Sequence, residues 1–262
     1  MTDAQIRFND GAAYEQMMGK WSRLAGAVFL DWLAPPPAMS WLDVGCGNGA
    51  FTELIAERCA PAAIAGVDPS EGQLKFARSR PSAQIATFQL GDAMALPFAD
   101  KNFDAAVMAL VIFFVPAPAK GVAEMVRVVR PGGSISAYAW DMAGGGFPFE
   151  QIYAEIRAAG LTPLMPPSVD ASRIDVLRDL WTSAGLLAVE TREITVQRTF
   201  ANFDEFWTVT ATGSAIQPVL AGMTDADVAA LKSRVRARLP DDADGRLTFA
   251  SRANAVKGYV PS

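Results

Sequence analysis

The residues with the clearest chemical potential lie in a glycine-rich stretch, WLDVGCGNGAF, at residues 41–51. Gly45, Gly47 and Gly49 occupy alternate positions behind a short apolar run that contains Asp43. A glycine-rich turn from a strand into a helix brings backbone N–H groups and a helix N-terminus against a ligand without obstruction from a Cβ atom. The pattern therefore indicates a binding site for a nucleotide-like cofactor.

The glycine pattern alone leaves the kind of cofactor open. Gly45, Gly47 and Ala50 also satisfy the relaxed dinucleotide motif G-x-G-x-x-G/A, and a tight turn for strand–helix packing would use similar residues. Asp43 precedes the loop, where a carboxylate attracts a cationic amino group and repels a pyrophosphate. This residue favours a cofactor that carries an ammonium group and no phosphate.

Two more acidic residues follow the next apolar runs. Asp68 closes the second run, at the place where a doubly wound sheet offers a carboxylate to ribose hydroxyl groups. It could instead cap the following helix, for which Ser70 is a competing candidate. Asp92 and Ala93 follow the third run, where a carboxylate and a backbone N–H could read the edge of an adenine ring.

Apolar runs alternate with helix-period segments between about residues 41 and 140, which is typical of a parallel sheet covered by helices. We expect strands at 41–44, 63–67, 83–90, 103–115, 134–140, 189–200 and 246–259. We expect helices at 12–33, 51–59, 70–78, 122–129, 173–184, 203–209 and 225–239. Pro-Gly-Gly at 131–133 should end the helix before it and separate it from the next strand.

The composition narrows the chemistry and the partners. The net charge is -5 and no stripe of Lys or Arg is present, which argues against nucleic acid as a partner. The chain has no histidine, so the commonest general base is absent. Cys46 and Cys59 are too few for a disulfide framework or a zinc site, and we expect no bound metal.

The length and the hydropathy pattern indicate a soluble cytoplasmic protein of one domain. The chain has 262 residues, near the upper end for a single domain. It begins MTDAQIRFND, without a basic start and an apolar run, and no later segment approaches the length of a membrane span. Either a monomer or a homodimer is compatible with these features.

The order of the motifs adds a family resemblance. LDVGCGNG, VDPS, GDAMALPFADKNFD and EMVRVVRPGG, over about residues 40–140, resemble class I S-adenosylmethionine-dependent methyltransferases of the branch similar to ubiquinone and menaquinone biosynthesis enzymes. Upstream, YEQMMGKWSR resembles the leader of bacterial members, and the tail matches only in outline.

This resemblance implies an α/β fold of the Rossmann-like, doubly wound kind. It implies a mostly parallel seven-stranded sheet with an antiparallel last strand, helices on both faces and a helical cap or lid. We expect a single domain over residues 1–262, with the cofactor-binding core at 35–140 and cap or acceptor-binding elements at 1–34 and about 141–213.

The resemblance also implies which residues bind S-adenosylmethionine. Asp43 and Gly45 would lie near its methionine amino group, and Asp68 would hold the ribose. The remaining implied contacts are Gly47, Gly49, Pro69, Asp92, Ala93 and Leu110, with Tyr14, Trp21 and Ser22 closing over the methionine end. Trp21 could equally be a core aromatic residue at helical spacing.

The acceptor side shows one departure from the family pattern. Relatives with a quinone-type acceptor often carry a His-His pair at the end of the fourth strand, where this chain has Phe113 and Phe114. The two rings indicate an apolar acceptor pocket, unless both belong to the core. Tyr138, Trp140 and Asp141 end the fifth strand on the same rim, and Asp141 is either a candidate base or an ordinary loop aspartate.

We therefore predict a methyltransferase that moves a methyl group by in-line displacement to a small, hydrophobic acceptor and releases S-adenosylhomocysteine. The segment 144–213 and the N-terminal helix should form a mobile lid whose apolar residues face the acceptor, among them Phe147, Phe149, Tyr153, Met165, Phe203, Phe206 and Trp207. The alternatives are a nicotinamide-dependent oxidoreductase and a non-catalytic cofactor-binding protein.

Overall fold

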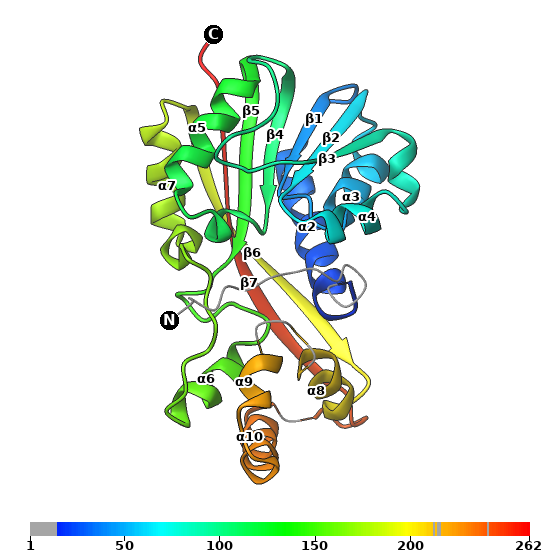
Figure 1. Cartoon of the computed structure of the whole chain (residues 1–262), viewed down its shortest axis with the longest axis vertical. Coiled ribbons are helices and arrows are strands. Elements are labelled where there is room, and N and C mark those ends of the chain that lie inside the picture. The colour runs from blue at the N-terminus through cyan, green and yellow to red at the C-terminus, as the bar shows by residue number, and fades with distance from the viewer. Residues whose placement is uncertain (1–14, 212, 214–215, 240) are drawn as a thin grey trace.

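A single mixed sheet organises the protein (Figure 1). The computed structural model describes residues 15–211, 213, 216–239 and 241–262. Within them the strand order is β3-β2-β1-β4-β5-β7-β6. The strands are β1 (Ser40–Val44), β2 (Ala63–Asp68), β3 (Ala86–Leu90), β4 (Phe103–Ala109), β5 (Val129–Trp140), β6 (Leu187–Phe200) and β7 (Leu247–Tyr259). Strands β1 to β5 pair in parallel and β7 runs antiparallel to β5 and β6, which confirms the predicted doubly wound, Rossmann-like fold.

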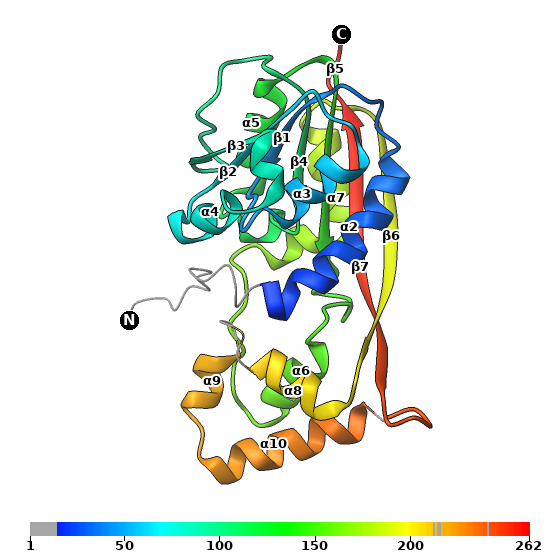
Figure 2. The same cartoon turned by 90° about the vertical axis from the view of Figure 1, so that its right-hand side faces the viewer.

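Helices cover both faces of the sheet (Figures 1 and 2). On one face α2 packs beside α3 and against β6, and on the other α7 packs beside α5 and against β6 and β7. The helices are α2 (Lys20–Leu33), α3 (Ala50–Arg58), α4 (Glu71–Ala77), α5 (Pro118–Val128), α6 (Glu150–Ala158), α7 (Ile174–Ser183), α8 (Phe203–Ala211), α9 (Gln217–Ala221) and α10 (Asp225–Arg238). The leader enters α2 through a π-helix, η1 (Glu15–Gly19). None of the helices in these described ranges combines the length and the apolar character needed to cross a bilayer.

The last two strands continue beyond the rest of the sheet. The pairing of β5 with β7 stops at Trp140 and Ala253, whereas β6 and β7 remain paired as far as Phe200 and Leu247. The extra length forms a two-stranded arm. Helices α6, α8, α9 and α10 gather around this arm, below the carboxyl ends of the parallel strands (Figures 1 and 2).

Three predicted boundaries were wrong. The fourth strand ends at Ala109 because Leu110 adopts a left-handed φ of 63°, and the 3₁₀ turn η3 (Ile112–Phe114) follows. The third strand begins only at Ala86, after a 3₁₀ turn that opens with Pro81. The Pro-Gly-Gly at 131–133 does not separate helix from strand.

At that last boundary the helix already ends at Val128. Strand β5 begins at Val129 and runs through the Pro-Gly-Gly, where its register against β4 shifts. A bulge tolerates proline and glycine because it leaves backbone groups out of the ladder. The cap predicted at Ser70 is confirmed, since its Oγ accepts a hydrogen bond from the N–H of Gln73 at 3.4 Å.

A buried carboxylate fixes α6 against α10. Glu155 of α6 is 4% exposed and accepts hydrogen bonds from Arg234 Nε at 2.8 Å and Arg238 Nε at 2.5 Å. The two guanidinium groups hold the pKa of Glu155 below its usual range, although burial acts in the opposite direction. Helix α6 also carries Tyr153, so this ion pair positions a residue of the site described below.

We expect Glu155→Gln to lower the free energy of unfolding by about 1 to 2 kcal/mol, because the amide loses a charge-assisted bond to each arginine. Asp204→Asn is the matched control, since Asp204 of α8 forms a surface ion pair with Lys232, which lies in α10 like the two arginines. Urea unfolding of both variants checks this. A loss for Asp204→Asn as large as that for Glu155→Gln would contradict it.

Candidate functional site

The glycine loop between β1 and α3 is built from left-handed glycines. Gly45, Gly47 and Gly49 have φ values of 74°, 52° and 80°. A Cβ atom on Gly45 would lie 2.6 Å from both methyl groups of Val111, whereas one on Gly47 would have no heavy atom within 4 Å. Gly45 is therefore required by packing, and Gly47 borders open space at the carboxyl end of the sheet.

Asp43 is the buried acid of the site. It is 1% exposed, and its Oδ2 accepts a hydrogen bond from Thr52 Oγ1 at 2.6 Å. Its Oδ1 has no hydrogen-bond partner among the described residues. Burial raises the pKa of Asp43 to about 7, with a smaller contribution from the nearby Asp68 and an opposing one from the Thr52 bond. An orphaned carboxylate oxygen of this kind suits a cationic donor.

Asp68 ties the glycine loop to the end of β2. Its Oδ2 accepts a hydrogen bond from the N–H of Gly47 at 2.9 Å, and its Oδ1 accepts one from the N–H of Ser70 at 2.8 Å. Burial raises its pKa, while these two bonds lower it. Two carboxylate oxygens offer about four acceptor positions, so Asp68 keeps capacity for hydroxyl donors.

Asp92 and Ala93 follow β3 as the sequence predicts. The Asp92 carboxylate is exposed and accepts a hydrogen bond from the N–H of Met94 at 2.8 Å, and Ala93 is half-buried. Pro69 is exposed beside Asp68. The structure thus brings these residues to the same sheet edge as the glycine loop, while their contacts with a cofactor stay predictions.

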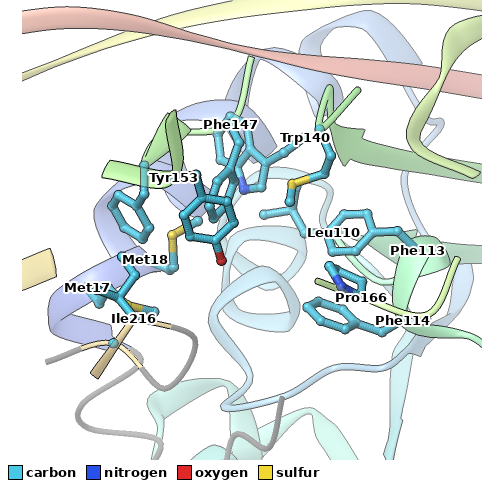
Figure 3. Close-up of a pocket in the computed structure, with 13 residues that line it drawn as sticks. Met17, Met18, Leu110, Phe113, Phe114, Trp140, Phe147, Tyr153, Pro166 and Ile216 are labelled. Atoms are coloured by element: carbon cyan, nitrogen blue, oxygen red, sulfur yellow. The ribbon is translucent and has the colours of Figure 1, made fainter. Parts of the chain in front are cut away.

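An apolar pocket lies beside the loop, where β4 and β5 end (Figure 3). Its cavity volume is about 50 Å³. The lining comes from the leader turn, from the ends of β4 and β5 with the loops after them, from α6 and the loop after it, and from two residues before α9. The lining residues are Met17, Met18, Leu110, Phe113, Phe114, Trp140, Met142, Phe147, Phe149, Tyr153, Pro166, Gly213 and Ile216. Val111 joins the two regions, because it touches Gly45 and sits between Leu110 and the phenylalanine turn.

The pocket is almost free of polar chemistry. None of the described residues that line it is an aspartate, glutamate, lysine or arginine. The hydroxyl of Tyr153 donates to the carbonyl oxygen of Leu164 at 3.3 Å, and burial holds the Tyr153 pKa well above its usual range. The lining therefore favours an uncharged ligand and supplies no carboxylate base.

The remaining candidate residues divide between pocket and core. Phe113, Phe114, Trp140 and Leu110 come together in the pocket. Tyr138 does not, because its ring packs on Phe29 and Phe51 with centroids 4.6 and 5.7 Å away.

The leader candidates lie mostly away from the pocket. Trp21 is fully buried behind the pocket, edge-on to Trp140 at 6.3 Å. The Ser22 hydroxyl is buried without a partner in the described part of the chain. Tyr14 lies outside the described residues.

Asp141 is engaged in a structural ion pair. Its Oδ2 accepts hydrogen bonds from Arg252 Nη2 at 2.5 Å and Nε at 2.9 Å, and its Oδ1 accepts one from the N–H of Gly144 at 2.9 Å. It is absent from the pocket lining. This arrangement favours the reading of Asp141 as a loop aspartate over that of a base.

The apolar residues predicted for the lid, in segment 144–213, divide between the pocket and the packing around α8. Phe147, Phe149 and Tyr153 line the pocket. Phe203 and Phe206 of α8 pack against each other, and Phe206 against Phe200. Trp207 stacks on Phe203, and Met165 is partly exposed.

Sequence reasoning missed part of the pocket wall. Met17 and Met18 read only as the apolar side of a helix, and Met142, Pro166 and Ile216 carry no local motif. The adjacent methionines next to a glycine, at the start of the leader helix, are the one local feature that could have drawn attention. Methionine is often used to line adaptable apolar sites.

Fold, glycine loop and acid positions together define a methyltransferase domain. Residues 42–137 match the family model described as a methyltransferase domain. A demethylmenaquinone methyltransferase of Symbiobacterium thermophilum is 42% identical over 97 residues, covering 35% of this chain and 39% of that protein. A malonyl-[acyl-carrier protein] O-methyltransferase of Methylococcus capsulatus is 35% identical over 134 residues, covering 51% of this chain and 47% of that protein.

A solved structure shows the same fold over most of the chain. The phosphoethanolamine N-methyltransferase 2 of Haemonchus contortus, in complex with S-adenosyl-L-methionine, superposes with a TM-score of 0.58 at 18% identity, covering 96% of this chain and 56% of that one. The matched segments span less than half the length of the two curated relatives. Over this domain the chain is thus similar to class I S-adenosylmethionine-dependent methyltransferases of the branch that includes ubiquinone and menaquinone biosynthesis enzymes.

The raised pKa of Asp43 predicts that cofactor binding depends on pH. A cationic amino group binds the ionised carboxylate, so below pH 7 binding must first remove a proton. With that pKa, S-adenosylhomocysteine should bind about tenfold more tightly at pH 8 than at pH 6, as calorimetry would measure. Asp43→Asn should bind weakly at both values, and an unchanged pH profile in that variant would assign the effect to another group.

The open space at Gly47 predicts a selective binding defect. Gly132 also has a positive φ, 76°, and no heavy atom within 4 Å of a Cβ position, but it lies far from the loop, in β5. Alanine at either position should cost about 1 to 2 kcal/mol of stability through left-handed strain. Only Gly47→Ala should also weaken S-adenosylhomocysteine binding, by about tenfold or more, in titrations run beside Gly132→Ala. Equal affinities of Gly47→Ala and Gly132→Ala for S-adenosylhomocysteine would show that Gly47 does not belong to the cofactor site.

Proposed function

We propose that the protein is an S-adenosylmethionine-dependent methyltransferase that moves a methyl group by in-line displacement to a small, uncharged, hydrophobic acceptor. The observation that carries this proposal is the orphaned, buried Oδ1 of Asp43 beside the open Gly47 position, adjoining an apolar pocket that lacks charge. The Asp43 oxygen would match the amino group of the cofactor, the open space at Gly47 would match the body of its nucleoside, and the apolar pocket would match the methyl acceptor.

The residues present fit the cofactor. Asp43 would receive the amino group of the methionine moiety, Gly47 and Gly49 would leave room for the chain, and Asp68 would accept hydrogen bonds from the ribose hydroxyl groups. Asp92 and Ala93 would meet the adenine. A pyrophosphate would instead meet two acids, the buried Asp43 and the partly buried Asp68, and burial already raises the pKa of each.

The protein's task in this reaction is alignment and exclusion of water. When bound, the cofactor supplies a methyl group that its sulfonium already makes electrophilic. Holding two reactants in line can contribute about 7 to 11 kcal/mol, whereas a general base adds a factor of about 10² to 10⁴. The apolar wall of Phe113, Phe114 and Trp140 suits the first task, and the absence of histidine is tolerable for it.

The chemistry of the wall favours some relatives' acceptors over others. The Symbiobacterium enzyme is named for demethylmenaquinone, and the Haemonchus enzyme for phosphoethanolamine. Transfer of a phosphate into a pocket without a cationic residue would leave its charge unpaired. An uncharged, ring-sized acceptor fits the lining of this protein better.

The pocket must enlarge to admit such an acceptor. Its volume of about 50 Å³ holds only a group of a few atoms. We infer that α6 moves outward as a lid together with Gly213 and Ile216, with Phe147, Phe149 and Tyr153 on its inner side. The core at 35–140 stays in place in this proposal, and residues 1–34 and 141–213 form the acceptor-binding cap of one domain.

Thermal-shift titration tests the cofactor. S-adenosylhomocysteine at 100 times its dissociation constant should stabilise the protein by about 2.7 kcal/mol, seen as a higher unfolding midpoint. NADH at the same concentration should not. The reverse result would favour the oxidoreductase alternative, which the relaxed glycine motif alone supports.

A matched acceptor pair tests the substrate class. With methyl-labelled S-adenosylmethionine, 1,4-naphthoquinol should accept label and phosphoethanolamine should not. Cofactor binding without transfer to an extended panel of uncharged acceptors would favour a non-catalytic binding protein.

A further inference from the structure

The leader turn η1 lies between the glycine loop and the apolar pocket and contacts both. On one side of this turn Met17 and Met18 line the apolar pocket (Figure 3). On the other side Glu15 reaches the glycine loop. A π-helix is rare and occurs frequently at functional sites, so its presence here fits a positioning role.

The Glu15 carboxylate is bound by two groups of the cofactor loop region. Its Oε2 accepts a hydrogen bond from Asn48 Nδ2 at 2.8 Å and another from Arg80 Nη2. Arg80 in turn donates through Nε to the carbonyl oxygen of Asn48 at 2.6 Å and through Nη1 to Glu53 Oε2 at 2.7 Å. One guanidinium therefore connects the leader, the glycine loop and α3.

We propose that Glu15 is a positioning residue that pins the leader turn to the glycine loop, so that cofactor binding at the loop is transmitted to the Met17–Met18 wall of the acceptor pocket. The proposal rests on the proposed function for its biological meaning. The contact itself stands on geometry alone.

The two ion pairs of Arg80 differ in burial. The Arg80 and Glu53 side chains are 12% and 15% exposed, whereas that of Glu15 is 40% exposed. The Arg80–Glu53 pair is therefore the more buried of the two. The half-exposed Glu15 pair is screened by solvent and adds little to the free energy of unfolding, so its effect is expected on the position of the turn.

Gly19 makes the position of Glu15 possible. A Cβ atom on Gly19 would lie 2.7 Å from both Cδ and Oε1 of Glu15, so the glutamate side chain folds back over the glycine. The far end of the turn is also held, because Arg198 Nη1 donates to the carbonyl oxygen of Met17 at 3.1 Å. The turn is thus anchored to the loop through Glu15 and to β6 through Arg198.

Three variants separate positioning from simple stability. Glu15→Gln keeps the shape of the side chain and removes its charge. Gly19→Ala keeps Glu15, pushes its carboxylate away from Arg80 and adds helix propensity. Glu53→Gln is the matched control, because it removes the other ion pair of the same guanidinium and does not touch the leader.

Amide hydrogen exchange over residues 15–19 and methionine methyl NMR, with and without S-adenosylhomocysteine, read out the coupling. We expect faster exchange in Glu15→Gln and Gly19→Ala than in the parent and Glu53→Gln, and a threefold to tenfold weaker affinity for S-adenosylhomocysteine in the first two. Addition of the ligand should shift the methyl signals of Met17 and Met18 in the parent and in Glu53→Gln only.

Each outcome decides the proposal. Parent-like exchange in Glu15→Gln, or slower exchange in Gly19→Ala through better helix formation, would overturn it. Methyl shifts that persist in Glu15→Gln would overturn the coupling. If the parent fails to bind S-adenosylhomocysteine, the proposed function falls, while the ligand-free exchange rates still decide whether Glu15 pins the turn.

Discussion

One carbonyl group shapes the whole site. The Val67 oxygen at the end of β2 accepts hydrogen bonds from the N–H groups of both Gly45 and Cys46, at 2.7 and 3.0 Å. Because two consecutive N–H groups donate to the same oxygen, the chain turns sharply as it leaves β1. Only a glycine fits beneath Val111 at this turn. The outward position of Gly47 and the start of α3 follow from that turn.

The site separates charge from apolar surface across a few residues. On the loop side Asp43 is buried, and its Oδ1, which has no partner among the described residues, is costly unless a ligand supplies the countercharge. On the pocket side the charged residues are kept away, and even Asp141 at the end of β5 is neutralised by Arg252. A ligand with a charged end and an uncharged reacting partner is matched by this division without any movement of the sheet.

Local spacing was sufficient to predict that the candidate cofactor residues lie together. Three glycines at alternate positions after an apolar run, and an acid at the end of each neighbouring strand, place Asp43, Gly47 and Asp68 at one sheet edge for any parallel α/β arrangement. The seven-stranded sheet and its antiparallel last strand followed from the family resemblance. For these elements the backbone rules leave few alternatives.

Contacts between residues far apart in the sequence could not be predicted. Asp141 looked available as a base because its partner, Arg252, is 111 residues further along the chain. Tyr138 and Trp140 lie two positions apart on β5 and so project from the same face of the strand. Only the tertiary structure shows that Tyr138 packs on Phe29 and that Trp140 lines the pocket. The left-handed Leu110 ended β4 early, and no propensity rule anticipates that conformation in a leucine.

The two-stranded arm of β6 and β7 gives the molecule an uneven stiffness. A ribbon of two strands twists more freely than a wide sheet and depends on what packs against it for its stability. The helices beside the arm therefore rest on two paired strands, whereas β1, β2, β4 and β5 are each paired on both sides. Under the proposed function, substitutions in the arm and its helices would alter the acceptor entrance and leave the glycine loop between β1 and α3 unchanged. Selection could then change the molecule that is methylated separately from the cofactor that supplies the methyl group.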